Sequence, residues 1–591
     1  MRRRLVIVST ALVVAAGLAL ALGTVHRSAA PEPPGVAART APPAAAVPSR
    51  AAGAGARAVA GDAPPLDNLA AYIPAQCYAV TRDEDRAGTA AKPGRTHNGC
   101  FACHQVSRPP SYADDYDVQV TQSLPRFATI NRWTNVLHPP PPVAMADAAL
   151  LDWVRRSNYR GDDGAPRLER AVQAWDRNGN GKWDGFAPDC WFHADEQGWD
   201  RDDHGRATGW RAYAYAPMPG MFWPTNGSAG DAFIRLPEAY RTDAAGGDSP
   251  AIYALNLAIL EATVRRTDVP IAPTDEKSVG LDLDGDGAMG TASRVAFAWP
   301  PAAGKRLHYV GQAASLDPAV AGWPAAGLYP VGTEIVHSVR YLDVAGGKVR
   351  MAARMKELRY MRKNHWYTYS DLDLRAKAEM REKDGKPNTL KRVIADAERG
   401  VTTGTGWRMQ GFIEDAGGEL RPETIEETAF CIGCHGGVGA STDSTFSFAR
   451  KVGGAEPDAG WYHWEEKGLA GIREPRRADG RGEYAVWLEE VGGGDDFLAN
   501  AEVARRFFGR DGVLRPAMAR ALAADISVVA MPSPERALDL DRAYLALVKA
   551  QSFARGRDVV LGEPRVKDRV VQDSATGITR VVGPPWKPAG R

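Results

Sequence analysis

Residues 100–104, CFACH, and residues 431–435, CIGCH, are the two stretches that decide which fold the sequence predicts. Both have the pattern C-x-x-C-H, which is the attachment signature of c-type haem. On a helical turn, two cysteines three positions apart lie on one face and can form thioethers with the two vinyl groups of haem, and the next histidine faces the iron. The sequence therefore predicts two covalently bound haem c groups. The residues that would hold them are Cys100, Cys103, Cys431 and Cys434 as attachment points, with His104 and His435 as proximal iron ligands.

A zinc site and a thioredoxin-like redox pair are the other structures in which paired cysteines occur. Zinc needs four protein ligands, whereas each motif supplies three from one short turn. A thioredoxin-like pair does not need a histidine directly after the second cysteine, and both motifs have one. The chain has only six cysteines, so two chance matches to the haem pattern are improbable.

With these two pentapeptides the sequence resembles the c-type cytochromes. The resemblance implies a mainly α, multidomain fold, in which two class-I-like cytochrome c haem domains flank a large irregular α+β insert. It also implies an electron-transfer protein that passes single electrons between its haem irons and redox partner proteins. The long stretch between His104 and Cys431 is more than a simple electron carrier needs.

The di-haem cytochrome c peroxidases and the rubber oxygenases are a more distant resemblance, because they also have two C-x-x-C-H motifs in one exported chain. In those families one haem passes electrons and the other keeps an open coordination site for peroxide or oxygen. The long insert and the 16 tryptophans favour this alternative, a di-haem oxidoreductase. No motif places an acid–base residue, so the catalytic residues are unknown.

The second axial ligand of each iron has two candidates, a methionine and a histidine. A class-I domain usually has a methionine on a loop after the attachment turn and before a C-terminal helix. Helical patterns at 147–156 and 538–548 each follow such a methionine. Histidines nearby would give bis-histidine ligation instead, and each candidate could equally be a core residue. The candidates are Met145 and His138 for the first haem, and Met531 and His463 for the second.

Two acidic loops between the motifs, residues 176–187 and 282–293, match the first half of a calcium loop. Oxygen donors stand at loop positions 1, 3 and 5, with glycine at position 6 and an apolar residue at position 8. Position 12 lacks the usual glutamate, so either the last carboxylate comes from elsewhere or the loops are Asx-rich turns. The predicted calcium ligands are Asp176, Asn178 and Asn180 in the first loop, and Asp282, Asp284 and Asp286 in the second.

Other patterns in the middle of the chain predict local structure. The aromatic and apolar cluster at 210–223 could line a haem or substrate pocket or pack in the core. Residues 252–266 are typical of an amphipathic helix, and residues 334–350 of strands around an Ala-Gly-Gly turn. In residues 351–363, apolar side chains recur at helical spacing, which indicates core packing rather than a cofactor site.

The N-terminus indicates export. Three arginines at positions 2–4 precede an uncharged apolar run at 5–25, which is typical of a signal peptide and is also long enough for a membrane anchor. No cysteine lies near the end of this run, which argues against a lipoprotein anchor. We therefore expect a periplasmic or other extracytoplasmic protein, either released or tethered by its N-terminus to the cytoplasmic membrane.

The composition gives no sign of nucleic-acid binding, because 73 Lys and Arg balance 72 Asp and Glu. Cys77 and Cys190 remain once the haems take their cysteines, and an oxidising compartment would allow a disulfide between them. The expected divisions are 1–25 signal peptide or membrane anchor, 26–65 disordered Ala/Pro-rich linker, 66–160 first haem domain, 161–300 insert with the acidic loops, 301–420 α+β connecting region, 421–555 second haem domain and 556–591 C-terminal tail.

Overall fold

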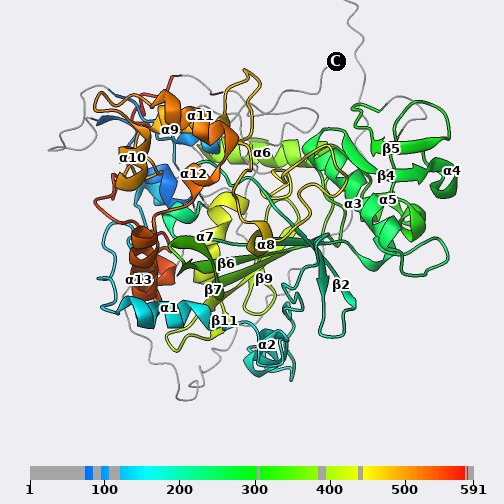
Figure 1. The fold of residues 1–591 in the computed structure, drawn as a ribbon, viewed down its shortest axis with the longest axis horizontal. Coiled ribbons are helices and arrows are strands. Elements are labelled where there is room, and N and C mark those ends of the chain that lie inside the picture. The colour runs from blue at the N-terminus through cyan, green and yellow to red at the C-terminus, as the bar shows by residue number, and fades with distance from the viewer. Residues whose placement is uncertain are drawn as a thin grey trace, which may run out of the picture. The chain divides into compact units, whose positions relative to one another are not determined.

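A computed structural model describes residues 73–83, 95–104, 120–124, 126–221, 223–301, 306–383, 394–436, 443–579 and 582. Residues Val59 to Arg591 form one compact unit. The expected signal or anchor and the linker lie outside the described residues. Within the unit, one antiparallel sheet takes strands from both sides of position 300, so it crosses the expected division between the insert and the connecting region (Figure 1).

This sheet has nine strands in the described chain, in the order β1-β2-β3-β6-β7-β10-β9-β8, and β11 pairs with β10. The expectation of a mainly α fold is therefore wrong. A separate two-stranded sheet consists of β4 and β5. The strand bounds are β1 Trp199–Arg201, β2 Ala207–Tyr213, β3 Ala232–Arg235, β4 Val269–Asp275, β5 Thr291–Val295, β6 Glu334–Ala345, β7 Lys348–Lys363, β8 Ala395–Asp396, β9 Gly400–Thr402, β10 Trp407–Glu414 and β11 Leu420–Pro422.

The β6–β7 hairpin is the centre of the sheet. Gly346 and Gly347 connect the two strands with positive φ angles of 57° and 74°, as a tight two-residue hairpin turn requires, which confirms the predicted turn. The helical spacing at 351–363 is misleading, because these residues belong to β7. Helices and loops cover this strand on both faces, so its burial does not alternate as it does in a half-exposed strand.

The helices lie around the sheet and between its loops (Figure 1). The predicted helix at 252–266 is confirmed as α3, although it is buried nearly all round rather than amphipathic. The helix bounds are α1 Asp147–Arg155, α2 Arg167–Ala171, α3 Pro250–Arg265, α4 Glu276–Val279, α5 Pro318–Ala321, α6 Tyr369–Lys383, α7 Ile425–His435, α8 Trp464–Lys467, α9 Glu483–Val491, α10 Ala501–Phe507, α11 Pro516–Ala524, α12 Ser527–Ala530 and α13 Pro534–Ala550.

Helices α1 and α13 confirm the helical patterns at 147–156 and 538–548, but they do not belong to two separate domains. They lie side by side against β6 and β7 (Figure 1), where Leu150 and Val154 of α1 share one core cluster with Leu545 and Val548 of α13. The two expected class-I-like domains are therefore replaced by one shared core.

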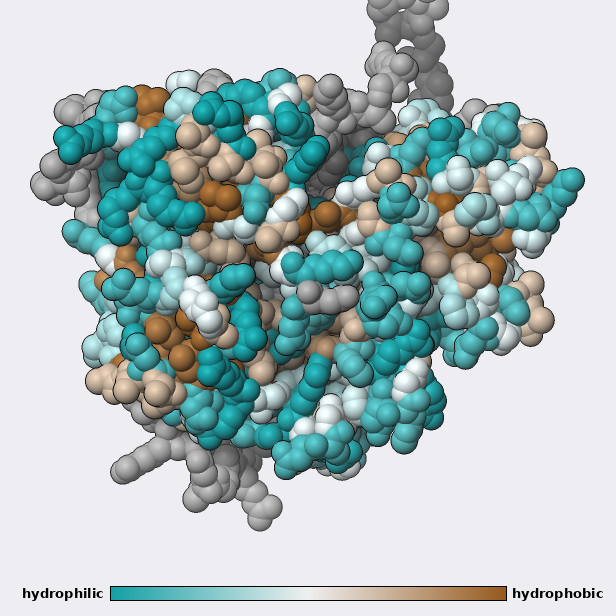
Figure 2. Space-filling model, viewed as in Figure 1, coloured by the Kyte–Doolittle hydropathy of each residue, from teal (hydrophilic) through white to brown (hydrophobic). Residues whose placement is uncertain are grey.

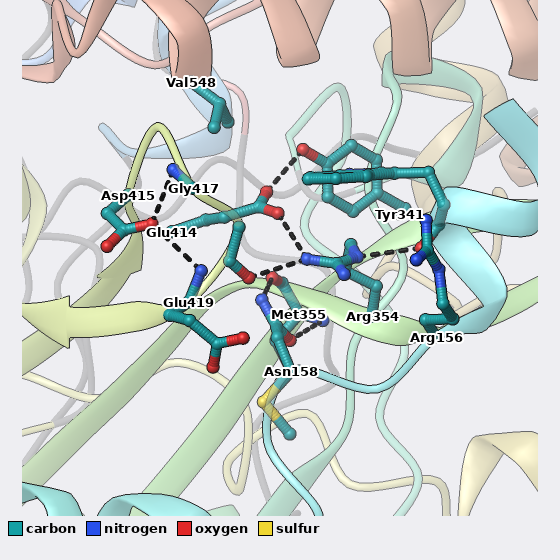
Figure 3. Close-up of polar contacts among 12 residues, drawn as sticks. Arg156, Asn158, Tyr341, Arg354, Met355, Glu414, Asp415, Gly417, Glu419 and Val548 are labelled. Atoms are coloured by element: carbon teal, nitrogen blue, oxygen red, sulfur yellow. Dashed lines mark hydrogen bonds and ion pairs between the residues drawn. The ribbon is translucent and has the colours of Figure 1, made fainter. Parts of the chain in front are cut away.

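A buried carboxylate joins α1 to the sheet (Figure 3). Arg354 of β7 donates to Glu414 of β10 at 2.7 Å and to the carbonyl oxygen of Trp153 in α1 at 2.8 Å. Tyr341 of β6 donates to the other oxygen of Glu414 at 2.6 Å. Burial raises the pKa of Glu414 to about 7, against the lowering effect of Tyr341 and Arg354. These bonds tie β6, β7, β10 and α1 into one unit.

The face seen in Figure 2 is mostly hydrophilic, and its hydrophobic side chains occur in small separate groups. Among the described residues, no helix has both the length and the apolar character needed to cross a membrane.

Candidate functional site

The second C-x-x-C-H motif forms the last turn of α7. The helix begins with a capping box, in which the Thr424 side chain accepts from the backbone of Glu427 and the Glu427 side chain accepts from the backbone of Thr424. Its last turn has Cys431 and Cys434 three positions apart, as two thioether bonds to one haem require. Desolvation raises the pKa of the Cys431 thiol to about 11 and that of the Cys434 thiol to about 12, so both stay protonated at neutral pH.

His435 ends α7 and is held in one orientation. Its Nδ1 lies 2.6 Å from the carbonyl oxygen of Ser444, and the ring of Phe446 packs edge-on against the imidazole at a centroid distance of 5.0 Å. Burial lowers the pKa of His435 to about 4, so the imidazole is neutral. A neutral ring that donates from Nδ1 to a carbonyl leaves the Nε2 lone pair for a metal, which is the arrangement of metal-bound histidines generally.

A cavity of about 840 Å³, which includes its open mouth, lies next to Cys431 and His435. Its floor is the sheet, because the strand register places Ile335, Met361 and Met409 in one row across β6, β7 and β10. The neighbouring row contains His337 and Arg359. The complete lining is Tyr215, Met218, Ile335, His337, Arg359, Tyr360, Met361, Met409, Gln410, Gly411, Thr428, Cys431, His435, Thr445, Phe446, Ser447 and Arg450.

The lining of this cavity suits an apolar group, because most of its exposed surface is apolar. One wall supplies the nitrogen ligand of His435 and the thiol of Cys431. The cavity lining therefore has two of the three residues with which the second motif would hold haem, and the third, Cys434, lies outside the lining.

The first motif forms a single turn, the 3₁₀ helix η4 (Cys100–Ala102), in which the backbone N–H groups of Cys103 and His104 both donate to the carbonyl oxygen of Cys100. Desolvation raises the pKa of Cys100 to about 11 and that of Cys103 well above its usual value. The segment that follows His104, residues 105–119, lies outside the described residues.

The structure brings the two motifs together. After desolvation, the thiols of Cys434 and Cys77 are the main influences that raise the pKa of Cys103, so both lie within electrostatic range of Cys103. Asp496 raises the pKa of thiols in both motifs. The two C-x-x-C-H turns, separated by more than half of the chain, thus share one buried region.

Two contacts hold the N-terminal segment in this region. The backbone of Ile73 and Pro74 passes so close to α7 that a Cβ on Gly433 would lie 2.8 Å from the Pro74 nitrogen. His97, just before the first motif, is buried between the Asp83 carboxylate at 2.5 Å and the Val491 carbonyl oxygen at 2.6 Å. Both ring nitrogens of His97 are used, so this histidine is structural.

The structure has neither a disulfide between the two spare cysteines nor a zinc site at the described residues of the motifs. Cys77 and Cys190 form no disulfide: Cys77 is within electrostatic range of Cys103, and Cys190 is buried in a core cluster with Trp210. A compact zinc site would gather at least three ligand atoms. In the part of the chain that the structure describes, the cysteines and histidines of the motifs form no such group.

None of the four expected second axial ligands lines the cavity. His138 is exposed, and Met145 packs against the core cluster of α1 and α13. His463 caps α8, and its Nε2 lies 3.1 Å from the buried Asp231 carboxylate. Met531 lines a second cavity, between the β6–β7 hairpin and α12.

Sequence reasoning found part of the cavity lining and missed the rest. Tyr215 and Met218 belong to the aromatic cluster at 210–223, for which a pocket was one of the two expectations. His337 and Arg359 gave no motif signal, because they are isolated polar residues in strands whose neighbours become close only through the sheet register.

A family model described as "-like lipoprotein" matches residues 63–518, which include both motifs. The chain belongs to this lipoprotein family. An "Uncharacterized lipoprotein" of Aquifex aeolicus (strain VF5) is 29% identical over 540 residues, which are 82% of this chain and 85% of that protein. No solved structure matches the chain.

Membership of the lipoprotein family corrects the sequence-based identification. The expectation of a c-type cytochrome that transfers single electrons is wrong, and so is the alternative of a di-haem peroxidase or oxygenase. As a member of this family the protein is extracytoplasmic, in line with its N-terminus. Membership of a lipoprotein family also disagrees with the expectation that the chain has no lipoprotein anchor. The first cysteine of the sequence, Cys77, belongs to the described, folded part of the chain.

The two acidic loops of this lipoprotein have the same internal hydrogen bonds. In each, the first Asp accepts from two glycine N–H groups, at 2.6 and 2.7 Å for Asp176 and at 2.7 and 2.9 Å for Asp282. A buried glutamate from outside each loop accepts from loop positions 2, 3 and 9. This glutamate is Glu398 for the first loop and Glu276 for the second, so each loop that lacks a carboxylate at position 12 has one packed against it from outside.

The charges of the two loops differ. In the first, Asp184 is paired with Lys182 at 3.2 Å and with Arg399 at 3.1 Å. In the second, oxygen atoms of Glu276, Asp282 and Asp284 lie within 4.8 Å of one another. Of the two, the second loop therefore has the better donor set for a divalent cation.

Proposed function

We propose that this lipoprotein is an extracytoplasmic haem-binding protein that holds two haem groups covalently at its two C-x-x-C-H turns. The observation that carries the proposal is His435, which is neutral, fixed through Nδ1 by the Ser444 carbonyl oxygen, and placed at a cavity beside Cys431. A histidine whose Nδ1 is fixed by a carbonyl oxygen and whose ring lines a mostly apolar cavity is prepared to bind a metal through Nε2.

The chain's own groups explain how attachment would proceed. Each thiol adds across one vinyl group, so that an S–C bond forms and the thiol hydrogen passes to the other vinyl carbon, with no oxidant consumed. The raised pKa values of Cys431 and Cys434 keep these thiols protonated and reduced until then. When bound, haem would supply an iron centre whose axial positions take ligands from the chain, His435 first among them.

The close approach of the two motifs also supports two haems rather than one. Cys103 and Cys434 are within electrostatic range of each other. A haem at each motif would therefore have the other motif as its neighbour.

We also propose that the second acidic loop binds Ca²⁺ through Glu276, Asp282 and Asp284. The specific observation in favour is the close grouping of three carboxylate oxygens beside backbone turns of calcium-loop form. The first loop, with Asp176, Asn178, Asn180 and the cation-paired Asp184, is the weaker candidate.

The protein would act in the periplasm, tethered to the cytoplasmic membrane by residues 5–25 or by lipid. Both proposals suit this compartment, because haem is attached to C-x-x-C-H motifs outside the cytoplasm and calcium is available there.

The test is to export the protein in a host with the haem attachment machinery and to digest the purified product. We expect two peptides, one with residues 100–104 and one with residues 431–435, each heavier by one haem. A pyridine haemochrome assay should give two haems per chain. Unmodified cysteines in both peptides would contradict the proposal.

A further inference from the structure

Two histidines line the cavity from different elements. His435 comes from α7, and His337 comes from β6, which is part of the sheet that forms the floor of the cavity. His337 stands opposite Arg359 of β7 in the strand register, which fixes its position along the sheet. The sequence motifs did not indicate His337.

The His337 imidazole is neutral and oriented. Burial, together with Arg359 and His435, lowers its pKa to about 3, and Asp231 and Glu357 oppose this effect. Both histidines belong to the lining of the same cavity. The Tyr215 hydroxyl lies 2.9 Å from Nε2 of His337, and Tyr215 is itself stacked on Trp464 at 5.5 Å.

Three methionines also line the cavity and are the rival ligands: Met218, Met361 and Met409. Met361 and Met409 are members of the main core cluster, where a flexible thioether fills space between larger side chains. Met218 is 5% exposed and does not belong to that cluster, so it is the best rival.

We propose that His337 is the second axial ligand of the haem held at Cys431, Cys434 and His435. This inference rests on the proposed function. Ligation through Nε2, with the ring proton on Nδ1, exchanges the hydrogen bond between Nε2 and Tyr215 for a bond to iron and leaves the Tyr215 hydroxyl beside the ligand. Of the chain's remaining lining residues, His337 is the one imidazole, and neutral imidazole is a strong iron ligand.

The test uses protein with Cys100→Ser and Cys103→Ser, so that only the second haem contributes to the spectra. The variant His337→Ala is compared with Met218→Leu by ferric absorption and EPR spectroscopy. We expect the parent and Met218→Leu to be low spin, whereas His337→Ala becomes high spin, binds carbon monoxide when reduced, and returns to low spin with added imidazole. An unchanged low-spin His337→Ala, or a high-spin Met218→Leu, would overturn the proposal.

A second measurement covers the case in which His337→Ala does not fold. Near-infrared magnetic circular dichroism of the unmutated protein separates bis-imidazole from imidazole–thioether ligation, and the absence of the bis-imidazole band overturns the proposal. Peptide mass separates this result from failure of the proposed function. Haem on residues 431–435 with the wrong axial ligand rejects only His337, whereas no haem there rejects the haem site itself.

Discussion

The two C-x-x-C-H turns have the same chemistry but different supports. The second ends an eleven-residue helix with a capping box, and its histidine is fixed by a carbonyl oxygen at a cavity. The first is one 3₁₀ turn held by contacts of its neighbours, such as His97 with Asp83. A motif therefore defines the bonds that a site can make, whereas the surrounding fold decides how rigidly the site is prepared.

The comparison also shows why two separate haem domains were the wrong expectation. The described residues of the first motif form one 3₁₀ turn, and its Cys103 lies within electrostatic range of Cys434 in α7. Each motif thus completes the surroundings of the other.

The largest expected effect is loss of haem from serine variants. Cys431→Ser with Cys434→Ser should remove the second haem, and Cys100→Ser with Cys103→Ser the first, because a hydroxyl forms no thioether. Pyridine haemochrome content should fall by half in each case. If the first haem depends on α7 as its neighbour, Cys431→Ser with Cys434→Ser should also lower the fraction of chains that have haem on Cys100 and Cys103, and peptide mass measures this fraction. Full haem content in either double variant contradicts covalent attachment.

A buried acid beside the second motif should make stability depend on pH. Burial raises the pKa of Asp558 to about 6, above its ordinary value of 3.8, despite the nearby Arg359 and Arg557. Because the pKa of Asp558 is higher in the folded state than in the unfolded state, its carboxyl does not lower the free energy of unfolding below about pH 4. It lowers that free energy as the pH rises from about 4 through 6.

Asp558→Asn should therefore stabilise the protein by about 2 kcal/mol at pH 8 and by almost nothing at pH 4. Urea unfolding at the two pH values measures the difference. An exposed acid such as Asp163, which is paired with Arg170 at the surface, provides the matched control, since Asp163→Asn should show no such gain. An equal effect of Asp558→Asn at both pH values would show that the charge is not the cause.

Two glycines next to the motifs should respond differently to alanine. A Cβ at Gly433 would lie 2.8 Å from the Pro74 nitrogen, whereas a Cβ at Gly99 would lie 3.6 Å from Val491, an ordinary contact. We expect Gly433→Ala to destabilise the protein by about 1–2 kcal/mol, after the gain in helix propensity, and Gly99→Ala to change stability by less than about 0.5 kcal/mol. Thermal unfolding tests this, and equal effects would mean that the segment at Pro74 does not pack tightly on α7.

The smallest expected effect concerns calcium. Adding millimolar Ca²⁺ should stabilise the protein by about 1–2 kcal/mol if the second loop binds it with the affinity of extracellular calcium modules. Glu276→Gln should abolish this gain, and Glu398→Gln, the equivalent change at the first loop, should keep it. Differential scanning calorimetry with calcium and with chelator measures both. A calcium effect that survives Glu276→Gln places the ion elsewhere.

Local patterns predicted the elements that depend on neighbouring residues. The helices α1, α3 and α13 and the Gly346–Gly347 turn follow from caps, periodicity and turn chemistry that are visible in a few residues. The sheet did not follow, because β7 is buried on both faces and its apolar residues show a helix-like spacing. A central strand that is buried along most of its length hides its period, so the full extent of the sheet was missed although strands were predicted around the Ala-Gly-Gly turn.

The candidate site divides in the same way. Cys431, Cys434 and His435 are contiguous and could be identified from the sequence, whereas His337 and Tyr215 reach the same cavity from distant strands and segments. Likewise, Glu276 and Glu398 replace a missing loop residue from outside the loop, and no spacing rule points to them. Residues that join a site through the sheet register become visible only in three dimensions.

X-ray diffraction data collected at the iron absorption edge from crystals of the exported protein would test the central claim most directly. The account predicts an anomalous peak in the cavity bonded to Nε2 of His435, a second peak at the first motif, and continuous density from Cys431 and Cys434 to the same macrocycle. A cavity without iron, with free thiols at Cys431 and Cys434, would contradict the account.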